Sequence, residues 1–540
     1  MNKHIINELE DKYDKLAWEK NTLSQALVDW EKKYSDKVAI VDDEKEFTYN
    51  KLLKDVNNYA AGLIKYGFEK GDKIVLQIPN SYEFVALSFA MFKIGVIPIM
   101  ALPAHREIEL KGIIKKSQAK AYIINNKYLG YDFLKLAKGL IDQLTNTLDV
   151  FVIGDCGKFK SIDILNDKNN IDEIKCNIDY KEIALLLLSG GTTGIPKLIP
   201  RRHTDYLYVA KKMAQKCKMN SDTVYLASLP ISHNFPLGCP GLVGTLSVGG
   251  KVVMCKTTSP DEILPLIEEQ RVSITGLVPA MAVMCADFIK DYDDYNLESL
   301  KVLQVGGSVL DSKTAKNISN TFGCKLQQIF GIAEGLICCT SLDDEDEIIY
   351  NCQGTPISDM DEVLIVDEDE NEVEAENYGE LIVRGPYTIH GYYNLEEVNK
   401  KCINKNGFFK TGDKARVLKN GNYQIAGRIK EMINRAGEKI TPFELEDILL
   451  KNNYIKNVQV VGIKDNFLGE RICVFILKDN NKELSLEEVR MFLVEKGVAT
   501  FKLPDQILYV EDWPLTSVGK ISKNKLKEIA LENNLVEEVL

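Results

Sequence analysis

Short apolar runs recur between helix-like segments along much of the chain. These runs are Lys73–Ile78, Val96–Met100, Ala121–Ile124, Val150–Ile153, Lys251–Cys255, Lys301–Val305 and Glu362–Val366. Continuous apolar runs of this length are typical of buried strands, and strands that alternate with helices favour α/β layers with much parallel sheet. The pattern therefore predicts an α/β fold built from layered β-sheets and helices.

One longer segment, Phe84–Ala104, is nearly apolar throughout and has the length of a membrane span. Lys93 lies near its middle, however, and Gly95, Pro98 and Pro103 interrupt it. Because a span needs about 20 continuous apolar residues, a helix of about 10 residues followed by a buried strand explains the segment better. We expect no membrane-spanning helix and no membrane partner.

The pattern changes near residue 430, where a smaller α+β unit begins. Its expected elements are a helix over Pro442–Lys451, strands over Asn457–Ile463 and Arg471–Leu477, a helix over Ser485–Lys496, a strand over Gln506–Val510 and a helix over Lys523–Glu532. A unit of about 110 residues has an ordinary domain size. We predict a large N-terminal domain over residues 1–428 and a mobile α+β C-terminal domain over residues 429–540, joined by a hinge near Arg428–Glu431.

Composition and charge narrow the class of protein. The 540 residues are 45% hydrophobic and 27% charged, as in ordinary globular proteins, and the net charge of -12 argues against a nucleic-acid partner. The first 20 residues lack the apolar run of a secretory signal, so we expect a cytoplasmic protein. The 12 cysteines include no C-x-x-C pair, which argues against a zinc site and a disulfide framework.

The strongest local signal is LLLLSGGTTGIPK, Leu185–Lys197, where a strand-like run ends in a loop of glycines and hydroxyl residues. Glycines let the backbone approach a bulky anion, while N–H groups, hydroxyls and a lysine can contact phosphate oxygens. The candidate phosphate-binding residues are Ser189, Gly190, Gly191, Thr192, Thr193, Gly194 and Lys197. Neither the Walker A nor the dinucleotide-binding spacing is present, and a surface turn is the alternative interpretation.

Five motifs together resemble the acyl-adenylate-forming (ANL) superfamily of adenylating enzymes, which includes acyl-CoA synthetases and the adenylation domains of nonribosomal peptide synthetases. They are SGGTTGIPK (189–197), FGIAEG (330–335), KTGD (410–413), GRIKEMINRAGEKI (427–440) and PLTSVGKISK (514–523). They occur in the family's order and cover almost the whole chain. Within the superfamily, HNFPLGCPG (233–241) and the flanking motifs look most like stand-alone aryl-acid AMP ligases of siderophore pathways.

The resemblance implies catalytic roles for Lys520, Glu334 and His233. Adenylation requires an anionic carboxylate to attack an anionic α-phosphorus, so positive charge is needed where negative charge concentrates. Lys520 resembles the family's mobile catalytic lysine, which would bridge the acid and the nucleotide. Glu334 resembles the glutamate that faces Mg²⁺, a cation that suits carboxylate, phosphate and water oxygens.

Further nucleotide contacts follow from the same resemblance. Asp413 resembles the aspartate that binds the ribose diol, and Arg428 resembles the arginine near the ribose or α-phosphate. Phe330 would cover one face of the adenine, with Gly306 and Gly307 opposite. A solvated lysine, a surface glutamate, an ordinary turn and a core phenylalanine are the corresponding structural alternatives for Lys520, Glu334, the KTGD segment and Phe330.

The C-terminal domain of the family rotates after adenylation, and the resemblance assigns Lys430 as the hinge residue. Lys520 would then leave the site, and the loop around Gly437 would line a tunnel for the phosphopantetheine thiol. Such hinge motions between packed domains set many turnover rates.

The segment His233–Gly241, with two prolines and two glycines, is expected to form an irregular loop against the substrate ring. The family resemblance implies that Asn234 hydrogen-bonds the 2-hydroxyl and carboxylate. Phe235 and Cys239 stand where dihydroxybenzoate ligases usually have Tyr and Ser, and Ile337 and Gly306 complete the acyl pocket. Losing two hydroxyl partners favours salicylate over 2,3-dihydroxybenzoate, because an unpaired buried hydroxyl costs about 1–3 kcal/mol.

These features predict activation of a hydroxybenzoic acid, with ATP and Mg²⁺, to an aryl-AMP and pyrophosphate. VGGSVL (305–310) resembles a carrier-protein serine site but lacks the usual preceding residue, so the acceptor is expected to be a separate aryl carrier protein, or CoA. Benzoate and other hydroxybenzoates remain possible acids. An aryl- or acyl-CoA ligase of the same superfamily and an inactive nucleotide-binding scaffold are the rival functions.

Overall fold

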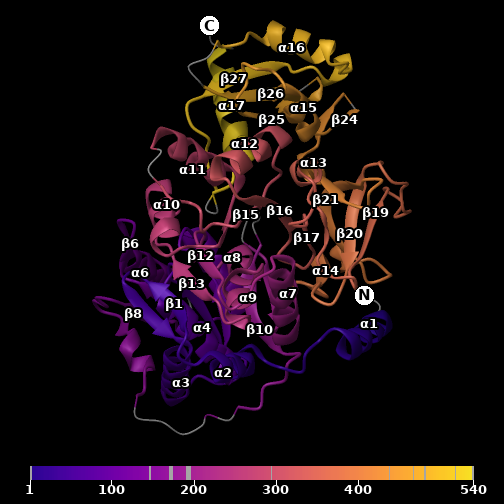
Figure 1. Cartoon of the computed structure of the whole chain (residues 1–540). Helices are drawn as coiled ribbons and strands as arrows, with labels where there is room; N and C mark the ends of the chain where they lie inside the picture. Colours follow the sequence, from indigo (N-terminus) through magenta and orange to yellow (C-terminus); the bar gives the residue numbers. More distant parts are fainter. Residues whose placement is uncertain are drawn as a thin grey trace.

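Two large sheets, both mainly parallel, form the centre of the N-terminal part (Figure 1). The first has nine strands in the order β18-β17-β16-β15-β14-β12-β13-β1-β2, with antiparallel partners only towards its two edges. Its strands are β1 (Val38–Asp42), β2 (Lys45–Thr48), β12 (Val224–Ala227), β13 (Lys251–Met254), β14 (Ile274–Leu277), β15 (Val302–Gly306), β16 (Lys325–Gly331), β17 (Ile337–Cys339) and β18 (Thr355–Pro356). The structure is a computed structural model that describes residues 3–144, 147–168, 174, 176–189, 196–292, 295–436, 438–465, 467–478, 482–516 and 519–537.

The second large sheet has seven strands in the order β11-β10-β4-β3-β5-β8-β9, of which only the β10–β11 pair is antiparallel. They are β3 (Lys73–Gln77), β4 (Ile97–Met100), β5 (Ala121–Asn125), β8 (Asp149–Ile153), β9 (Lys160–Ser161), β10 (Ile183–Leu188) and β11 (Leu198–Arg202). A separate hairpin pairs β6 (Lys127–Tyr128) with β7 (Tyr131–Asp132).

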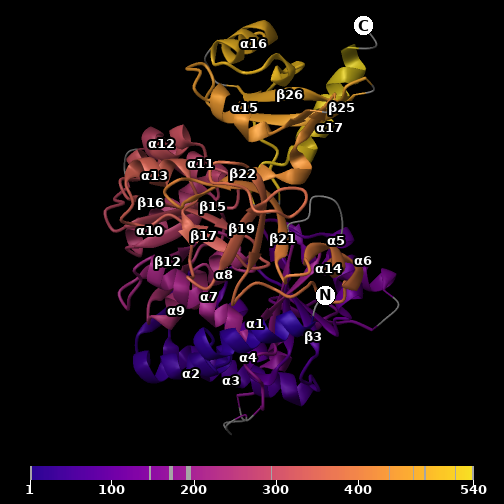
Figure 2. The same ribbon diagram turned by 90° about the vertical axis from the view of Figure 1, so that its right-hand side faces the viewer.

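Helices bury the apolar faces of these sheets. One large core joins residues of both sheets to α2 (Leu23–Tyr34), α3 (Tyr49–Tyr66), α4 (Tyr82–Ile94), α7 (His203–Lys216) and α9 (Gly241–Ser247). A second core lies beneath α5 (Glu107–Ser117) and α6 (Phe133–Gln143). Further helices beside the nine-stranded sheet are α10 (Pro260–Glu269), α11 (Pro279–Asp291), α12 (Ser312–Phe322) and α13 (Asp346–Asn351), and α1 (Lys3–Leu16) and α14 (Glu396–Cys402) lie nearer the four-stranded sheet described below (Figure 2).

The segment that has the length of a membrane span is a helix and a strand, as predicted. Ser81 caps α4 by accepting a hydrogen bond from the Phe84 N–H at 3.3 Å, and Gly95 ends it with a left-handed φ of 73°. Glycine adopts this conformation without steric cost, which explains why the helix stops there. No helix in the described part of the chain is long and apolar enough to cross a membrane.

Two smaller sheets follow. The first is antiparallel, with β19 (Glu362–Val366), β20 (Gly379–Arg384), β21 (Phe409–Val417) and β22 (Tyr423–Arg428) in chain order. The predicted strand at Glu362–Val366 therefore exists, but in an antiparallel sheet rather than in the parallel layers. β22 ends at Arg428, and a single 3-10 turn, Ile429–Glu431, leads to the C-terminal sheet.

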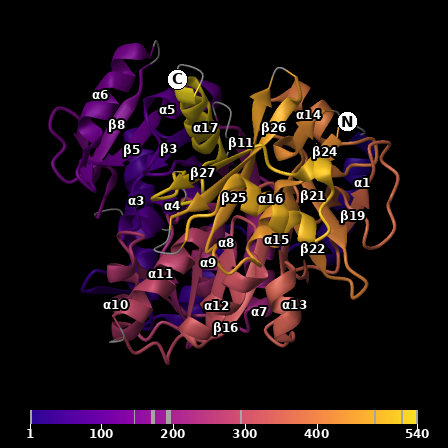
Figure 3. The ribbon, with the colours of Figure 1, turned by 90° about the horizontal axis from the view of Figure 1, so that it is seen from above.

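The C-terminal sheet has the order β24-β23-β26-β25, with β27 paired to β26. Its elements are β23 (Ile433–Arg435), β24 (Glu438–Ile440), β25 (Val458–Asp465), β26 (Gly469–Leu477), β27 (Gln506–Val510), α15 (Pro442–Leu449), α16 (Leu486–Glu495) and α17 (Lys523–Glu537). All six elements expected here are present, and the short β23–β24 hairpin is additional. Figures 1 and 3 show this small domain seated over one end of the larger part.

Candidate active site

The candidate site lies at the carboxyl ends of adjacent parallel strands of the nine-stranded sheet. In the order β16-β15-β14-β12, these strands lead into Phe330 and Gly331, Gly307, Val278 and the 228–233 turn. Ligands of open α/β sheets usually bind beyond the carboxyl ends of the strands, where loops can supply polar groups. The strand order therefore brings three of the predicted segments to one edge, namely those at Phe330, Gly307 and His233, and adds Val278.

Lys520 reaches this edge from the C-terminal domain. Its turn is closed by a hydrogen bond from its own N–H to Thr516 Oγ1 at 3.1 Å. A methyl group added at Gly307 would lie 3.1 Å from Lys520 Cε and 3.6 Å from its Nζ, and Val278 borders the same space. The absence of a side chain at Gly307 thus leaves the room that Lys520 occupies.

The surroundings of Lys520 lower the pKa of its ammonium group. Burial lowers the pKa of Lys520 to about 8, and the nearby Arg428 guanidinium acts in the same direction against the attraction of Asp413 and Glu431. Burial also lowers the pKa of His233 to about 3, and the charge of Lys520 adds to this effect. His233 is therefore neutral at pH 7, and its Nδ1 accepts a hydrogen bond from the Phe235 N–H at 3.2 Å.

This pKa predicts a pH limit on adenylation. Lysine carries its charge only below its pKa, so kcat/KM for the acid should fall about tenfold per pH unit above pH 8 if the ammonium form is required. Lys520→Arg should remove this limb, because a guanidinium stays protonated throughout the range. The measurement is kcat/KM from pH 6 to 10; an alkaline limb that persists in Lys520→Arg would assign the ionisation to another group.

Asp413 and Arg428 form the second part of the site. They are paired across β21 and β22, and Arg428 Nε donates to Asp413 Oδ1 at 2.9 Å. Burial raises the pKa of Asp413 to about 6, although Arg428 and the Thr411 hydrogen bond oppose the shift. Asp413 Oδ2 is buried and has no hydrogen-bond partner among the described residues. An orphaned carboxylate oxygen of this kind can accept a hydrogen bond from a ligand hydroxyl.

Glu334 lies in the turn between β16 and β17, and the side chain of Tyr392 connects it to the phosphate-loop region. The Tyr392 hydroxyl donates to Glu334 Oε1 at 2.8 Å, and Lys197 Nζ lies 4.3 Å from the centre of the Tyr392 ring. Gly335 packs closely on Thr388, where a methyl group would lie 2.7 Å from Cα. Tyr392 thus joins two predicted functional residues, although no sequence motif identified it.

The oxygen chemistry of Glu334 fits a hard divalent cation, but only as part of a ligand set. The described residues contain no cluster of three or more His, Cys, Asp or Glu side chains suited to a metal ion. A Mg²⁺ ion at Glu334 would therefore take its remaining ligands from nucleotide phosphates and water, which is how Mg²⁺ is commonly bound.

The base of the glycine-rich loop is closed by its two ends. Ser189 N–H donates to the Lys197 carbonyl at 3.0 Å, and Lys197 N–H donates to Ser189 Oγ at 3.0 Å. The predicted phosphate contacts at Gly190, Gly191, Thr192, Thr193 and Gly194 lie outside the described residues, as does Gly437 of the predicted thiol tunnel.

The segment 233–241 corrects one prediction, because it is helical rather than irregular. It contains α8 (Asn234–Gly238) and the start of α9, with His233 capping α8 through its imidazole. Capping by a side chain at the first position lets this Gly/Pro-containing sequence form a short turn of helix. Asn234, Phe235 and Cys239 are all buried, and Asn234 Nδ2 donates to Cys239 Sγ at 3.4 Å.

The remaining predicted residues lie on β15, β16 and β17 and in the 3-10 turn before the C-terminal sheet. Gly306 ends β15 so close to β16 that a methyl group would lie 2.6 Å from the Ile329 carbonyl oxygen. Ile337 is buried on β17, and Phe330 is partly buried on β16. Lys430 is exposed in the 3-10 turn between the last two sheets.

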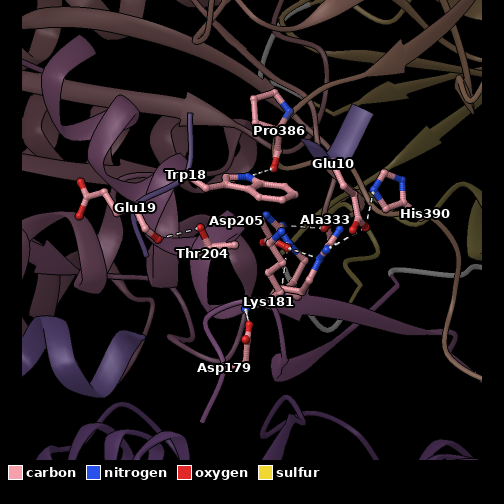
Figure 4. A network of polar contacts seen from close by, with 12 residues as sticks. Glu10, Trp18, Glu19, Asp179, Lys181, Thr204, Asp205, Ala333, Pro386 and His390 are labelled. Carbon is pink, nitrogen blue, oxygen red and sulfur yellow. Dashed lines mark hydrogen bonds and ion pairs between the residues drawn. The ribbon is translucent and has the colours of Figure 1, made fainter. Parts of the chain in front are cut away.

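A network of polar contacts joins α1, the end of β11 and the start of α7 to the segments that carry Ala333 and His390 (Figure 4). Arg201 is fully buried, and it donates to Asp205 Oδ1 through Nε and to the Ala333 carbonyl through Nη1, both at 3.0 Å. Glu10 Oε1 on α1 lies 3.5 Å from Nε2 of His390, which belongs to the loop that leads to Tyr392. Sequence reasoning assigned no role to Arg201, which lies four residues after the end of the phosphate-loop motif.

A core with a candidate nucleotide site at a sheet edge, and a small domain that inserts a lysine into it, are features of an adenylate-forming enzyme. The family model of AMP-binding enzymes matches residues 27–393, and that of the AMP-binding enzyme C-terminal domain matches residues 444–520. The chain belongs to the family of AMP-binding enzymes, which confirms the resemblance and the predicted fold class.

Individual relatives agree with this assignment. The chain is 40% identical over 531 residues to 2,3-dihydroxybenzoate-AMP ligase of Bacillus subtilis (98% of this chain, 97% of the relative). It is 37% identical over 514 residues to salicyl-AMP ligase / salicyl-S-ArCP synthetase of Mycobacterium tuberculosis (94% and 91%). The apo structure of MbtA from Mycobacterium smegmatis is 36% identical with a TM-score of 0.75, and the match covers 97% of each chain.

Proposed function

We propose that the protein uses ATP to convert a hydroxybenzoic acid, salicylate or 2,3-dihydroxybenzoate, into its aryl-AMP, and then transfers the aryl group to a phosphopantetheine thiol on a separate aryl carrier protein. The observation that carries the proposal is the position of Lys520 against Gly307, with Arg428 and Asp413 near enough to influence its charge. Relatives of high coverage whose names specify hydroxybenzoate-AMP ligases support the class of acid.

In the first step a carboxylate oxygen of the acid forms a bond to the α-phosphorus of ATP, and the bond from that phosphorus to the bridging oxygen breaks to release pyrophosphate. Lys520 would stabilise both the carboxylate and the α-phosphate oxygens with its positive charge, and its place beside Gly307 at the sheet edge supports this role. His233 near it is neutral, so Lys520 supplies the positive charge there without a second cation beside it. In the second step the thiol loses its proton to solvent, its sulfur bonds to the acyl carbon, the acyl–oxygen bond breaks, and AMP leaves.

The nucleotide would be held by groups of the N-terminal part. Asp413 Oδ2 would accept from a ribose hydroxyl, and Ser189 with Lys197 would contact phosphate oxygens. Phe330, Gly306 and Gly307 would border the adenine. Mg²⁺ bound at Glu334 would neutralise phosphate charge, while Tyr392 holds the Glu334 carboxylate in place.

Transfer to a thiol would require Lys520 to leave the site. We propose a boundary after residue 428 and rotation about Lys430, because this exposed residue lies in the only turn between β22 and β23. The segment around Gly437 would then approach the acyl-AMP. CoA instead of a carrier protein would make the protein an aryl-CoA ligase, and the two acceptors are distinguished by a direct transfer assay.

The acid pocket supports a preference for salicylate. Burial raises the pKa of the Cys239 thiol to about 12, so it is a neutral and weak hydrogen-bond partner. Phe235 offers no hydroxyl, and its ring packs against Gly276. A 3-hydroxyl placed here would lack a strong partner.

Restoring two hydroxyls should therefore change the preferred acid. In the double variant Phe235→Tyr and Cys239→Ser, we expect the kcat/KM ratio of 2,3-dihydroxybenzoate to salicylate to rise about tenfold, because one hydrogen bond to a buried hydroxyl is worth about 1–3 kcal/mol. Acid-dependent ATP–pyrophosphate exchange measures both values.

Cys352→Ser is the matched control. Its Sγ donates to the Ile348 carbonyl at 3.2 Å, away from the pocket, and a serine hydroxyl can make the same contact. The control should leave the acid ratio unchanged. An unchanged ratio in the double variant as well would show that Phe235 and Cys239 do not contact the substituted side of the ring.

The proposed function is tested by ATP–pyrophosphate exchange with salicylate, 2,3-dihydroxybenzoate, benzoate, 4-hydroxybenzoate and a fatty acid. Strong exchange with one hydroxybenzoate is the expected result. Exchange only with the fatty acid would contradict the proposed acid while keeping the reaction class. Absence of exchange with every acid would favour an inactive nucleotide-binding protein.

A further inference from the structure

Tyr206 contacts Asn234 and Gly238 of the segment proposed to form the acid pocket, and it has no part in the reaction steps proposed for the site. It lies on α7, four residues after the end of the Leu198–Ile199–Pro200–Arg201–Arg202 strand, and is fully buried. Its hydroxyl donates to Asn234 Oδ1 at 3.1 Å. The ring supports α8 directly, since a methyl group added at Gly238 would lie 2.8 Å from Tyr206 Cζ.

The side-chain amide of Asn234 has an acceptor, Oδ1, and a donor, Nδ2, and its neighbours decide how the two atoms are oriented. In the observed orientation Oδ1 accepts from Tyr206 and Nδ2 donates to Cys239 Sγ at 3.4 Å. Turning the amide over would place Nδ2 at the Tyr206 hydroxyl. The phenol would then become an acceptor, and its own buried proton would need another partner.

Among the described residues the Tyr206 hydroxyl makes a hydrogen bond to Asn234 Oδ1 and to no other group, so a turned amide would leave its proton without that acceptor. A buried donor without an acceptor costs roughly a factor of ten or more in an equilibrium constant. The observed amide orientation is therefore the favoured one. It leaves the second hydrogen of Asn234 Nδ2 for a ligand.

Arg201 strengthens the same preference. Its guanidinium carbon lies 5.0 Å from the centre of the Tyr206 ring. Burial raises the pKa of Tyr206 well above its usual value, which keeps the phenol protonated, and the Arg201 charge opposes this shift. A cation near a phenol makes its O–H a better hydrogen-bond donor, so Tyr206 is held in the donating role towards Asn234.

Asn234 lies near the place proposed for the carboxylate. The ring of its neighbour Phe235 packs against Gly276 on β14, two residues before Val278, and Val278 borders the space that Lys520 occupies. Lys520 must lie near the acid carboxylate if it acts as proposed. The Asn234 amide is thus placed to meet a substituent ortho to that carboxylate.

We infer that Tyr206 is a positioning residue: its hydroxyl fixes the Asn234 amide so that the N–H₂ group, and not the carbonyl oxygen, faces the ortho substituent of the acid. This inference rests on the proposed function. The ortho oxygen of salicylate can accept while its own proton is shared with the carboxylate. The amino group of 2-aminobenzoate has its lone pair delocalised into the ring, so it meets the amide with donors only.

The test compares salicylate, 2-aminobenzoate and benzoate as acids in ATP–pyrophosphate exchange. In the wild-type protein, kcat/KM should favour salicylate over 2-aminobenzoate by about tenfold to a hundredfold, the usual effect of facing two donors in a buried site. Tyr206→Phe keeps the ring on Gly238 and beneath Arg201 but frees the amide to turn over. Its salicylate to 2-aminobenzoate ratio should fall by about tenfold, with little change for benzoate.

Tyr208→Phe, two residues further along α7, is the matched control. Its hydroxyl contacts Ser358 Oγ at 2.7 Å rather than Asn234, so its loss should leave the ratio unchanged. A second variant, Asn234→Asp, presents only acceptors to the ligand, and its ratio should shift towards 2-aminobenzoate even though overall activity falls.

The outcomes separate this inference from the function on which it rests. An equal loss with all three acids in Tyr206→Phe, at an unchanged ratio, would reduce Tyr206 to a structural role and overturn the inference. Wild-type exchange that does not distinguish salicylate from 2-aminobenzoate would overturn it while leaving the proposed function intact. Absence of exchange with every aromatic acid would overturn both.

Discussion

Lys520→Ala is expected to lower the rate of aryl-AMP formation about a hundredfold to a thousandfold, the usual effect of removing one preorganised group that stabilises transition-state charge. Its side chain occupies the space beside Gly307 and Val278, so its loss leaves that space open without disturbing a buried ion pair. ATP binding should be nearly unchanged, because Asp413 and the phosphate loop remain. Single-turnover formation of aryl-AMP and calorimetric titration with ATP measure the two quantities.

Lys525→Ala provides the control for loss of a lysine in the same region. This residue is exposed on the first turn of α17 and should show wild-type rates. Transfer from preformed aryl-AMP to the thiol should also remain in Lys520→Ala, because Lys520 has no part in that step. Wild-type aryl-AMP formation by Lys520→Ala would refute the catalytic role.

Asp413→Asn is expected to raise the KM for ATP about tenfold to a hundredfold, with a smaller effect on the KM for the acid. The change preserves the size of the side chain but removes the charge that pairs with Arg428, and it replaces an acceptor with an N–H₂ donor. A ribose hydroxyl that donates to Oδ2 would lose a charged partner, and hydrogen bonds to charged groups contribute about 1.5–3 kcal/mol. Initial rates at varied ATP and varied acid separate the two KM values.

Glu370→Gln is a suitable comparison for this variant. Glu370 forms an ion pair with Lys410, which lies on β21 as Asp413 does, and it is not among the groups that shift the pKa of Lys520 or Asp413. It should leave the KM for ATP unchanged. If Asp413→Asn lowers the melting temperature but not the affinity for ATP, Asp413 has a structural rather than a ribose-binding role.

Most of the predicted strands in the two large sheets are buried on both faces, whereas the predicted strands β19 and β27 are mainly partly buried. Lys73–Ile78 and Lys301–Val305 correspond to β3 and β15, each within a residue or two at the ends. A strand surrounded by helices on both sides must be apolar throughout, and this requirement is visible without any alignment. The antiparallel setting of Glu362–Val366 was not visible, because an apolar run carries no information about the direction of its neighbour.

Short elements and supporting contacts were harder to predict. The helix α8 was expected to be irregular, since glycine and proline are common in loops, and its formation depends on capping by His233. Tyr392, Arg201 and Tyr206 act through neighbours distant in sequence. No local pattern distinguishes such residues from other buried aromatic or charged side chains.

The sequence by itself determined which segments form buried strands and helices, and its five motifs determined the family and the candidate residues. Both depend on local composition and order, which the chain carries directly. Only the tertiary structure decided that Lys520 meets Gly307, that Tyr392 joins Lys197 to Glu334, and that Tyr206 orients Asn234. Contacts of this kind depend on strand order and on the seating of one domain on another, because these bring together groups far apart along the chain.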